Sequence, residues 1–269
     1  MATNMSNETP ENPATERFGY RYGPKGAHTS RTIMLDELSH VLASVPASGT
    51  RDDHVHAIID GNVTEKKTAA TRRHTIQRLS ELYGLDPSLV LFRVLRRFWD
   101  ANPDGRPLLA LLCALARDPL LRLTSPVVLA LKPGEELSRQ QMVNVIQVGA
   151  GERLNVDSID KVVRNCSSSW TQSGHLHGRV RKIRQRIEAT PLSAAYALLL
   201  GYLERVRGSQ LLRTPWAQVL DATPEQLIHL AKDAKRLGVL DLKQAGEVVE
   251  IGFSSLLTRD EIRDSHGKS

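Results

Sequence analysis

The chain has 269 residues, of which 41% are hydrophobic and only 4% are aromatic. This length supports one large domain or two small ones. The abundance of Leu, Ala and Arg favours helices over a β-sandwich, because unbranched side chains lose little freedom on a helix. Two cysteines without a partner pattern argue against a disulfide framework or a cysteine-based zinc site. The most apolar run, residues 108–116, is about half the length that spans a bilayer, and no secretory signal is evident. We therefore expect a cytoplasmic protein without a membrane segment.

The net charge of +6 is unevenly distributed along the chain. Residues 66–97 carry eight Lys or Arg and two acids, residues 161–186 carry seven Lys or Arg and no acid, and the rest of the chain sums to −7. Concentrated positive charge attracts polyanions, of which phosphate backbones are the commonest in a cell. We expect the two basic segments to converge on one polyanion. The alternative is a pair of solvated helix faces that bind nothing.

The N-terminal two thirds of the chain predict an arm followed by a helical domain. Residues 1–30 are polar and lack an apolar period, which predicts a disordered or loosely docked arm. Residues 31–188 are expected to form a helical domain with a helix-turn-helix-like element, and residues 166–174 a polar loop within it. Six dipeptides that place a capping residue before proline indicate helix starts: Asp86-Pro87, Asp118-Pro119, Ser125-Pro126, Thr190-Pro191, Thr214-Pro215 and Thr223-Pro224.

The C-terminal part changes its period from 3.6 to about 2. Helical stripes begin near residues 192, 215 and 224, and two alternating segments, 239–243 and 247–253, then predict a hairpin. This order is typical of a winged helix, so we expect a winged-helix-like domain at residues 189–258 and a polar tail at 259–269. The expected fold class is mainly α: a multi-helical bundle with helix-turn-helix-like elements and a C-terminal winged-helix-like β-hairpin.

The first candidate site lies where a helix ends at Gly61 and a second helix opens with Lys, Thr and Arg. A helix-turn-helix presents the start of its second helix to the major groove, where hydroxyls and arginines reach phosphates and base edges. The connection is longer than the usual tight turn, and the alternative is an ordinary helical hairpin with a basic face. The predicted DNA contacts are Lys66, Lys67, Thr68, Thr71, Arg72, Arg73 and Arg78.

The second candidate site is the basic run at residues 175–186. Val180, Ile183 and Ile187 are predicted to face the core while the basic side chains point outward. A run of one sign repels itself unless an anion screens it, so it favours phosphates, with an acidic partner protein as the alternative. The predicted contacts are Arg179, Arg181, Lys182, Arg184 and Arg186.

The remaining patterns give weaker signals. The predicted wing module offers Lys232, Lys235, Arg236 and Lys243, but acids dilute this charge, and many winged helices make only protein contacts. The histidine pairs His54/His56 and His175/His177 lack further ligands at metal spacing, and each is interpreted as part of a solvated polar face. Neither a nucleophile elbow nor a phosphate-binding glycine loop is present. We expect no cofactor, no metal and no catalytic centre.

The segments Ala57-Ile58-Ile59, Asn62-Val63 and Lys66 to Arg73, with the helical stretch 108–121, resemble the BrxA family of bacterial BREX phage-defence systems. The resemblance covers about residues 50–170. It implies a helical accessory protein that binds duplex DNA beside other defence proteins, and it carries to Lys66, Lys67, Thr71, Arg72 and Arg73 as DNA contacts. The alternatives are an adaptor that docks acidic proteins and a transcription regulator. A homo-oligomer is possible, and the choice between DNA and RNA stays open.

Overall fold

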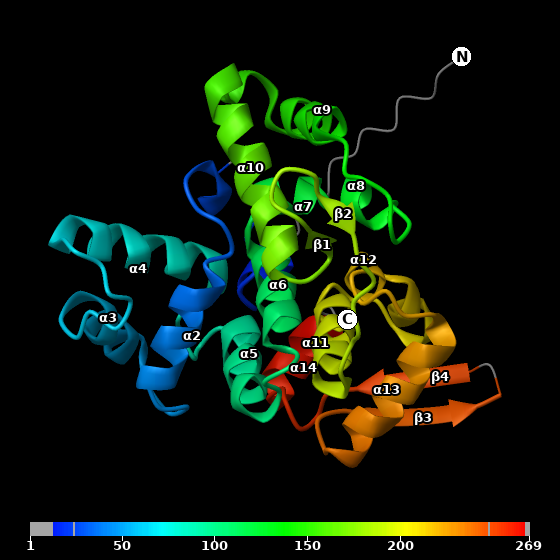
Figure 1. Ribbon diagram of the computed structural model, residues 1–269. Coiled ribbons are helices and arrows are strands. Elements are labelled where there is room, and N and C mark those ends of the chain that lie inside the picture. Colours follow the sequence, from blue (N-terminus) through cyan, green and yellow to red (C-terminus); the bar gives the residue numbers. More distant parts are fainter. Residues whose placement is uncertain (1–12, 24, 247, 267–269) are drawn as a thin grey trace.

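The computed structural model describes residues 13–23, 25–246 and 248–266. It is mainly helical, with a small two-stranded hairpin near the C-terminus, as the sequence predicts (Figure 1). The first half contains α1 (Pro13–Glu16), the 3₁₀ helix η1 (Ala27–Thr29), α2 (Leu35–Ser44), α3 (Arg51–Ile59), α4 (Ala69–Tyr83), α5 (Val90–Ala101), α6 (Arg106–Arg117), α7 (Pro119–Leu123) and α8 (Ser125–Leu129). The second half contains α9 (Arg139–Ala150), η2 (Gly151–Arg153), α10 (Val156–Gln172), β1 (Leu176–His177), β2 (Ile183–Arg184), α11 (Pro191–Leu203), η3 (Gly208–Arg213), α12 (Pro215–Gln218), α13 (Pro224–Arg236), β3 (Asp241–Ala245), β4 (Val248–Gly252) and α14 (Arg259–His266).

Helices α6 and α11 form the centre of the core. All residues of α6 from Leu108 onward are buried, and so are all residues of α11 from Leu192 onward. Both helices are apolar nearly all round, which is the pattern of a helix surrounded by other elements. Helix α11 packs against α5, α6 and α13, and the Tyr196 hydroxyl donates to the Leu91 carbonyl at 3.0 Å. The most apolar run of the sequence, residues 108–116, thus belongs to a buried helix at the centre of the core.

Four of the six predicted proline-associated starts are confirmed. The side chains of Asp118, Thr190, Thr214 and Thr223 cap α7, α11, α12 and α13. At the other two dipeptides the prediction is wrong by a few residues. Asp86 accepts from the Ser88 amide in a turn ahead of α5, which begins at Val90. Ser125 is already the first residue of α8.

Residues 13–23 and 25–30 are built into the core, so the prediction of a disordered or loosely docked arm is wrong for them. Phe18 and Tyr20 are each 2% exposed, and the Tyr20 hydroxyl donates to the Leu200 carbonyl of α11 at 2.7 Å. The buried guanidinium of Arg117 donates to the carbonyls of Gly19 and Glu81 and so joins this segment to α4. Aromatic residues in a polar context act here as anchors. Residues 1–12 of the predicted arm lie outside the described residues.

Residues 166–174 are not the predicted polar loop, because α10 continues to Gln172. Ser167 donates to the Val163 carbonyl at 2.8 Å, and Thr171 donates to the Ser167 carbonyl at 2.9 Å. The hydroxyls are therefore satisfied within the helix itself, one turn back. Trp170 is fully buried, and its indole nitrogen donates to Thr124 at 2.8 Å. A polar helix face packed against other helices resembles a loop in the sequence.

The C-terminal hairpin pairs β3 with β4 in antiparallel register, with Asp241 opposite Gly252 and Ala245 opposite Val248. Helix α13 lies beside this hairpin (Figure 1). Residues 259–266 are not the predicted tail but helix α14, which is joined to the body by the ion pairs Arg93–Glu261 and Arg17–Asp264, both at 2.8 Å. Residues 267–269 of the predicted tail lie outside the described residues. Within the described ranges, no helix is long and apolar enough to cross a membrane.

Candidate nucleic-acid interface

Helices α3 and α4 are joined by an ordered connection, residues 60–68. Thr50 and Asp53 form a capping box at the start of α3, with the Thr50 amide donating to Asp53 at 2.7 Å. At the end of α3 the Val63 amide donates to the Ala57 carbonyl at 3.1 Å. Asn62 adopts a left-handed conformation (φ 49°), and its side chain accepts from the Lys66 amide at 2.9 Å. The connection is therefore fixed by its own hydrogen bonds, and it sets the direction in which α4 begins.

The first turn of α4 combines a helix N-terminus with unneutralised cations. Thr68 caps the helix and accepts from the Thr71 amide at 3.1 Å, and the turn contains no acid. Lys67 and Arg73 are exposed and Arg72 is half-buried, and none of the three forms an ion pair with a described carboxylate. The positive end of the helix dipole adds to these charges. This end of α4 is the strongest concentration of unpaired positive charge among the predicted contacts.

Two predicted contacts near α4 are occupied within the protein. Lys66 pairs with Glu37 of α2 at 2.8 Å, and Arg78 pairs with Glu81 one turn further along α4 at 2.7 Å. The side chain of Lys66 is 27% exposed and that of Arg78 is 24% exposed, so both are mostly covered by the protein. Arg78, which is predicted to contact DNA, is therefore held against the helix by the Glu81 carboxylate.

The run at residues 175–186 forms the hairpin β1–β2, with Leu176 opposite Arg184, and its predicted arrangement is wrong. Val180 is 91% exposed at the tip instead of facing the core. Gly178 allows the tight turn, because a Cβ there would lie 2.1 Å from the Arg181 carbonyl oxygen. Residues 134–137 pair with the outer side of β2, with the Arg184 amide donating to the Glu135 carbonyl at 2.8 Å.

Three of the five cations of this run are held by the protein. Arg184 is buried and forms an ion pair with Asp221, Arg181 pairs with Glu136 at 2.6 Å, and Lys182 donates to the Gly178 carbonyl at 2.7 Å. The sequence could not place these partners because Glu136 and Asp221 are distant along the chain. Arg179 and Arg186 are exposed and form no ion pair with any described carboxylate.

The predicted contacts on α4 and those on the β1–β2 hairpin do not gather at one point. In the view of Figure 1, α4 lies on one side of α6 and α10, and the β1–β2 hairpin lies on the other. The expectation that these two sets of contacts converge is therefore wrong. Both sets of contacts are rich in Lys and Arg, but their cations play different roles. Near the start of α4 the cations are unpaired, whereas the hairpin uses most of its cations to attach to the rest of the protein.

The predicted wing module also neutralises part of its charge. Arg236 pairs with Asp233, and Lys243 lies 3.5 Å from the Glu250 carboxylate. Lys235 donates to the Leu242 carbonyl at 2.9 Å. Lys232 remains exposed, without an ion pair to a described carboxylate. This module consequently offers less free positive charge than the start of α4.

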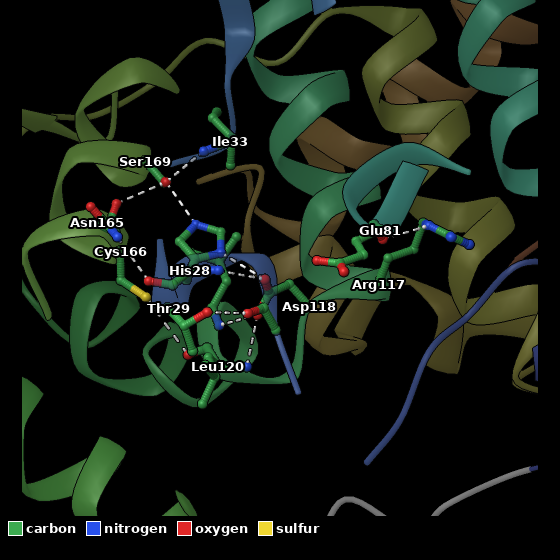
Figure 2. A network of polar contacts seen from close by, with 12 residues as sticks. His28, Thr29, Ile33, Glu81, Arg117, Asp118, Leu120, Asn165, Cys166 and Ser169 are labelled. Atoms are coloured by element: carbon green, nitrogen blue, oxygen red, sulfur yellow. Dashed lines mark hydrogen bonds and ion pairs between the residues drawn. The ribbon is translucent and has the colours of Figure 1, made fainter. Parts of the chain in front are cut away.

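A buried Ser–His–Asp arrangement, which sequence reasoning missed, lies between η1, α7 and α10 (Figure 2). Asp118 Oδ2 lies 2.9 Å from His28 Nδ1, and His28 Nε2 lies 2.8 Å from Ser169 Oγ. The residues are 90 and 51 positions apart in sequence and none stands in a motif, so no local pattern could have indicated the cluster. The geometry alone resembles a nucleophile, base and orienting acid.

Burial and hydrogen bonding give this cluster a structural role in the conformation described. All three side chains are almost completely buried, so no substrate can approach Ser169. Ser169 donates to the Asn165 carbonyl at 2.9 Å and accepts from the Ile33 amide at 2.9 Å. The Ser169 hydroxyl is thus engaged with two backbone groups as well as with His28. The cluster ties the N-terminal segment to α7 and α10.

Two histidines predicted to be solvated are buried instead. His175 is 0% exposed, and its Nε2 lies 2.8 Å from the Val219 carbonyl oxygen, while His54 is 1% exposed and lies edge-on to Phe92. Burial is the largest cause that lowers the pKa of His175, to about 4, which keeps the ring neutral. Within the part of the chain that the structure describes, no group of three or more potential metal ligands gathers.

No protein-family model matches the chain, and no curated protein matches it significantly. The resemblance to the BrxA family therefore rests on the residues quoted for it.

Proposed function

We propose that this protein binds duplex DNA through the first turn of α4, as an accessory protein without a catalytic centre of its own. The observation that carries the proposal is the group Lys67, Arg72 and Arg73, which flanks the first turn of α4: Lys67 precedes the cap residue Thr68, and Arg72 and Arg73 follow in the helix. None of the three has a carboxylate partner among the described residues. Isolated cations gathered at one exposed point attract phosphates, and the amides of the first turn add donors. The buried Thr64 hydroxyl and Arg72 Nε also lack hydrogen-bond partners among the described residues.

The arrangement of α2, α3 and α4 supports a helix-turn-helix assignment. Helix α3 packs against both α2 and α4, and the C-terminal half of α4 is anchored on α6, where Cys113 contacts the Leu82 carbonyl. The N-terminal half of α4 is left exposed, as a recognition helix requires. The ordered connection of residues 60–68 takes the place of the shorter turn.

We also assign α11, α12, α13 and the β3–β4 hairpin to a winged-helix-like module. Their order fits, and η3 lies beside β4 on the outer side of the hairpin, where a winged helix has a further strand. In this proposal the module adds support to DNA binding at most through Lys232, because its other cations are neutralised or hydrogen-bonded. Membership of a BREX-like phage-defence system, in the manner of BrxA, is part of the same proposal.

The experiment is fluorescence anisotropy with a random duplex, comparing the wild type with Lys67→Glu/Arg73→Glu. Both side chains are exposed, so the change should not disturb folding. We expect the affinity to fall by about 10- to 100-fold, since two phosphate contacts are lost and two repulsions are added. Lys132→Glu/Arg259→Glu, which makes the same charge change at exposed positions elsewhere, is the control and should cost far less. Equal losses of duplex affinity in the two variants would show that only the net charge of the protein matters, and they would contradict a binding site at α4.

A second candidate function is an adaptor that docks a partner protein. Its supporting observation is the exposure of large apolar side chains. Val148 and Val156 of α9 and α10 are exposed, and so are Val180 at 91%, Val248 at 72% and Leu237 at 59%. Val180 lies at the tip of the β1–β2 hairpin, Leu237 follows α13 and Val248 begins β4. None of these exposed side chains lies on α4. Absence of a duplex shift at low salt, with the protein folded, would favour this candidate over DNA binding.

A further inference from the structure

A cavity of about 280 Å³ lies between the loop after α2 and one face of α5. Its lining residues are Ala47, Gly49, Pro87, Phe92, Arg93, Arg96, Arg97 and Asp100. Gly49 is packed so closely that a Cβ there would lie 2.3 Å from a Val45 methyl, so the loop wall is tightly fixed. Arg93, Arg96 and Arg97 belong to the basic segment 66–97, but none of the residues predicted to contact DNA lines this cavity, and the proposed function does not use it.

The cavity has one basic wall and one apolar wall. Arg93, Arg96 and Arg97 lie on one face of α5 at spacings of three and four residues, whereas Asp100 is the only carboxylate among the lining residues. Arg93 is itself paired with Glu261 at 2.8 Å, and Arg97 donates to the Ser255 carbonyl at 2.8 Å, so Asp100 is the one lining acid for the charges of Arg96 and Arg97. Ala47 and Pro87, from the loops beside α5, supply apolar surface next to these polar groups, and Phe92 of α5, itself 1% exposed, lies beneath. A mixture of apolar and polar lining is the usual composition of a small-molecule site.

Arg96 is the least satisfied of these arginines. Its side chain is 8% exposed, with Nη1 donating to Asp100 at 2.8 Å and Nη2 donating to the Val45 carbonyl at 3.1 Å. The remaining donor, Nε, is buried and has no partner among the described residues. A buried donor without an acceptor is costly, and an anion in the cavity would supply one. His54 Nε2, close to Phe92, is also buried without a described partner.

We propose that this cavity binds a small phosphate monoester with a flat apolar body, of the mononucleotide class. Arginine guanidinium groups match phosphate oxygens in geometry as well as charge. Ala47 and Pro87 present apolar surface to the body of the ligand. The volume is near the lower limit of roughly 300 Å³ for small-molecule sites, which suits a mononucleotide better than a dinucleotide.

The test is isothermal titration calorimetry of the full chain with AMP, inorganic phosphate and adenosine at matched ionic strength. We expect saturable binding of AMP at one site, at least 10-fold weaker binding of phosphate, and none of adenosine. Arg97→Ala removes an exposed cation of the cavity, and Ala47→Trp fills the cavity without removing a charge; each should weaken AMP binding at least 10-fold. Arg73→Ala on α4 is the control and should leave it unchanged.

The outcomes separate this proposal from DNA binding. Loss of AMP binding in both cavity variants, with duplex affinity unchanged, supports a separate ligand site. No saturable heat with AMP up to 10 mM (on the order of the weakest useful affinities), or unchanged AMP binding in Ala47→Trp, would overturn it. Equal affinities for phosphate and AMP would contradict the role given to the apolar wall.

Discussion

At the scale of single residues, buried polar groups hold distant segments together. Asp118 accepts from the amides of His28, Leu120 and Leu121 and from the His28 ring. Burial alone raises the pKa of this carboxyl, but the interaction with His28 and the amide hydrogen bonds lower the pKa by more than burial raises it. The net pKa therefore lies below the usual 3.8. The carboxylate therefore stabilises the fold when it is ionised.

Asp118→Asn should lower the free energy of unfolding by about 1–3 kcal/mol at pH 7, because three buried amides and the His28 ring lose their charged acceptor. A depressed folded-state pKa means that the contribution of Asp118 is fully present above about pH 4 and is lost as the pH falls through the folded-state value. Urea unfolding from pH 7 to pH 3 measures this. An Asp118→Asn protein as stable as the wild type at pH 7 would contradict the account.

His175 predicts a second pH window. Because burial lowers its pKa from 6.5 to about 4, the unfolded chain binds more protons between these values. Its stabilising contribution is complete above pH 6.5, declines as the pH falls, and is gone below pH 4. In His175→Asn, the slope of the unfolding free energy against pH between 6.5 and 4 should become shallower by up to about 3 kcal/mol over the window. Parallel slopes in the two proteins would show that His175 is not buried as a neutral ring.

At the scale of elements, local sequence patterns were sufficient to predict a helix or strand where that element buries one apolar face against the core. The helices of the core and the C-terminal hairpin follow from period and capping residues, and Thr190 and Thr223 begin their helices as expected. Residues 166–174 and 176–184 were not predictable. Their structure depends on partners far away in the chain, such as Thr124 for Trp170 and Asp221 for Arg184.

The β1–β2 hairpin gives a prediction that separates attachment from binding. Arg184→Ala leaves Asp221 without its buried partner and should lower the free energy of unfolding by about 3–5 kcal/mol. Arg179→Ala, in the same hairpin but exposed and without a described ion pair, should change it by no more than about 0.5 kcal/mol. Chemical denaturation of both variants measures the difference. Similar small effects would mean that the hairpin is not held by Arg184.

At the scale of the whole molecule, charge position matters more than net charge. The sequence locates the excess positive charge correctly, but its neutralisation is a three-dimensional property. Glu37, Glu136 and Asp221 each come from other elements to neutralise a predicted contact. Among the predicted contacts that stay unpaired, Lys67, Arg72 and Arg73 lie near the start of α4, whereas Arg179 and Arg186 belong to the hairpin on the other side of α6 and α10 (Figure 1).

The salt dependence of duplex binding tests this account most directly. Three phosphate contacts from Lys67, Arg72 and Arg73 predict that log K falls against log salt with a slope of about −3, and that Lys67→Glu/Arg73→Glu reduces the slope by about 2. Arg179→Glu/Arg186→Glu on the hairpin should keep the wild-type slope. If the hairpin variant lost the slope while the α4 variant kept it, the proposed interface would be on the wrong side of the molecule.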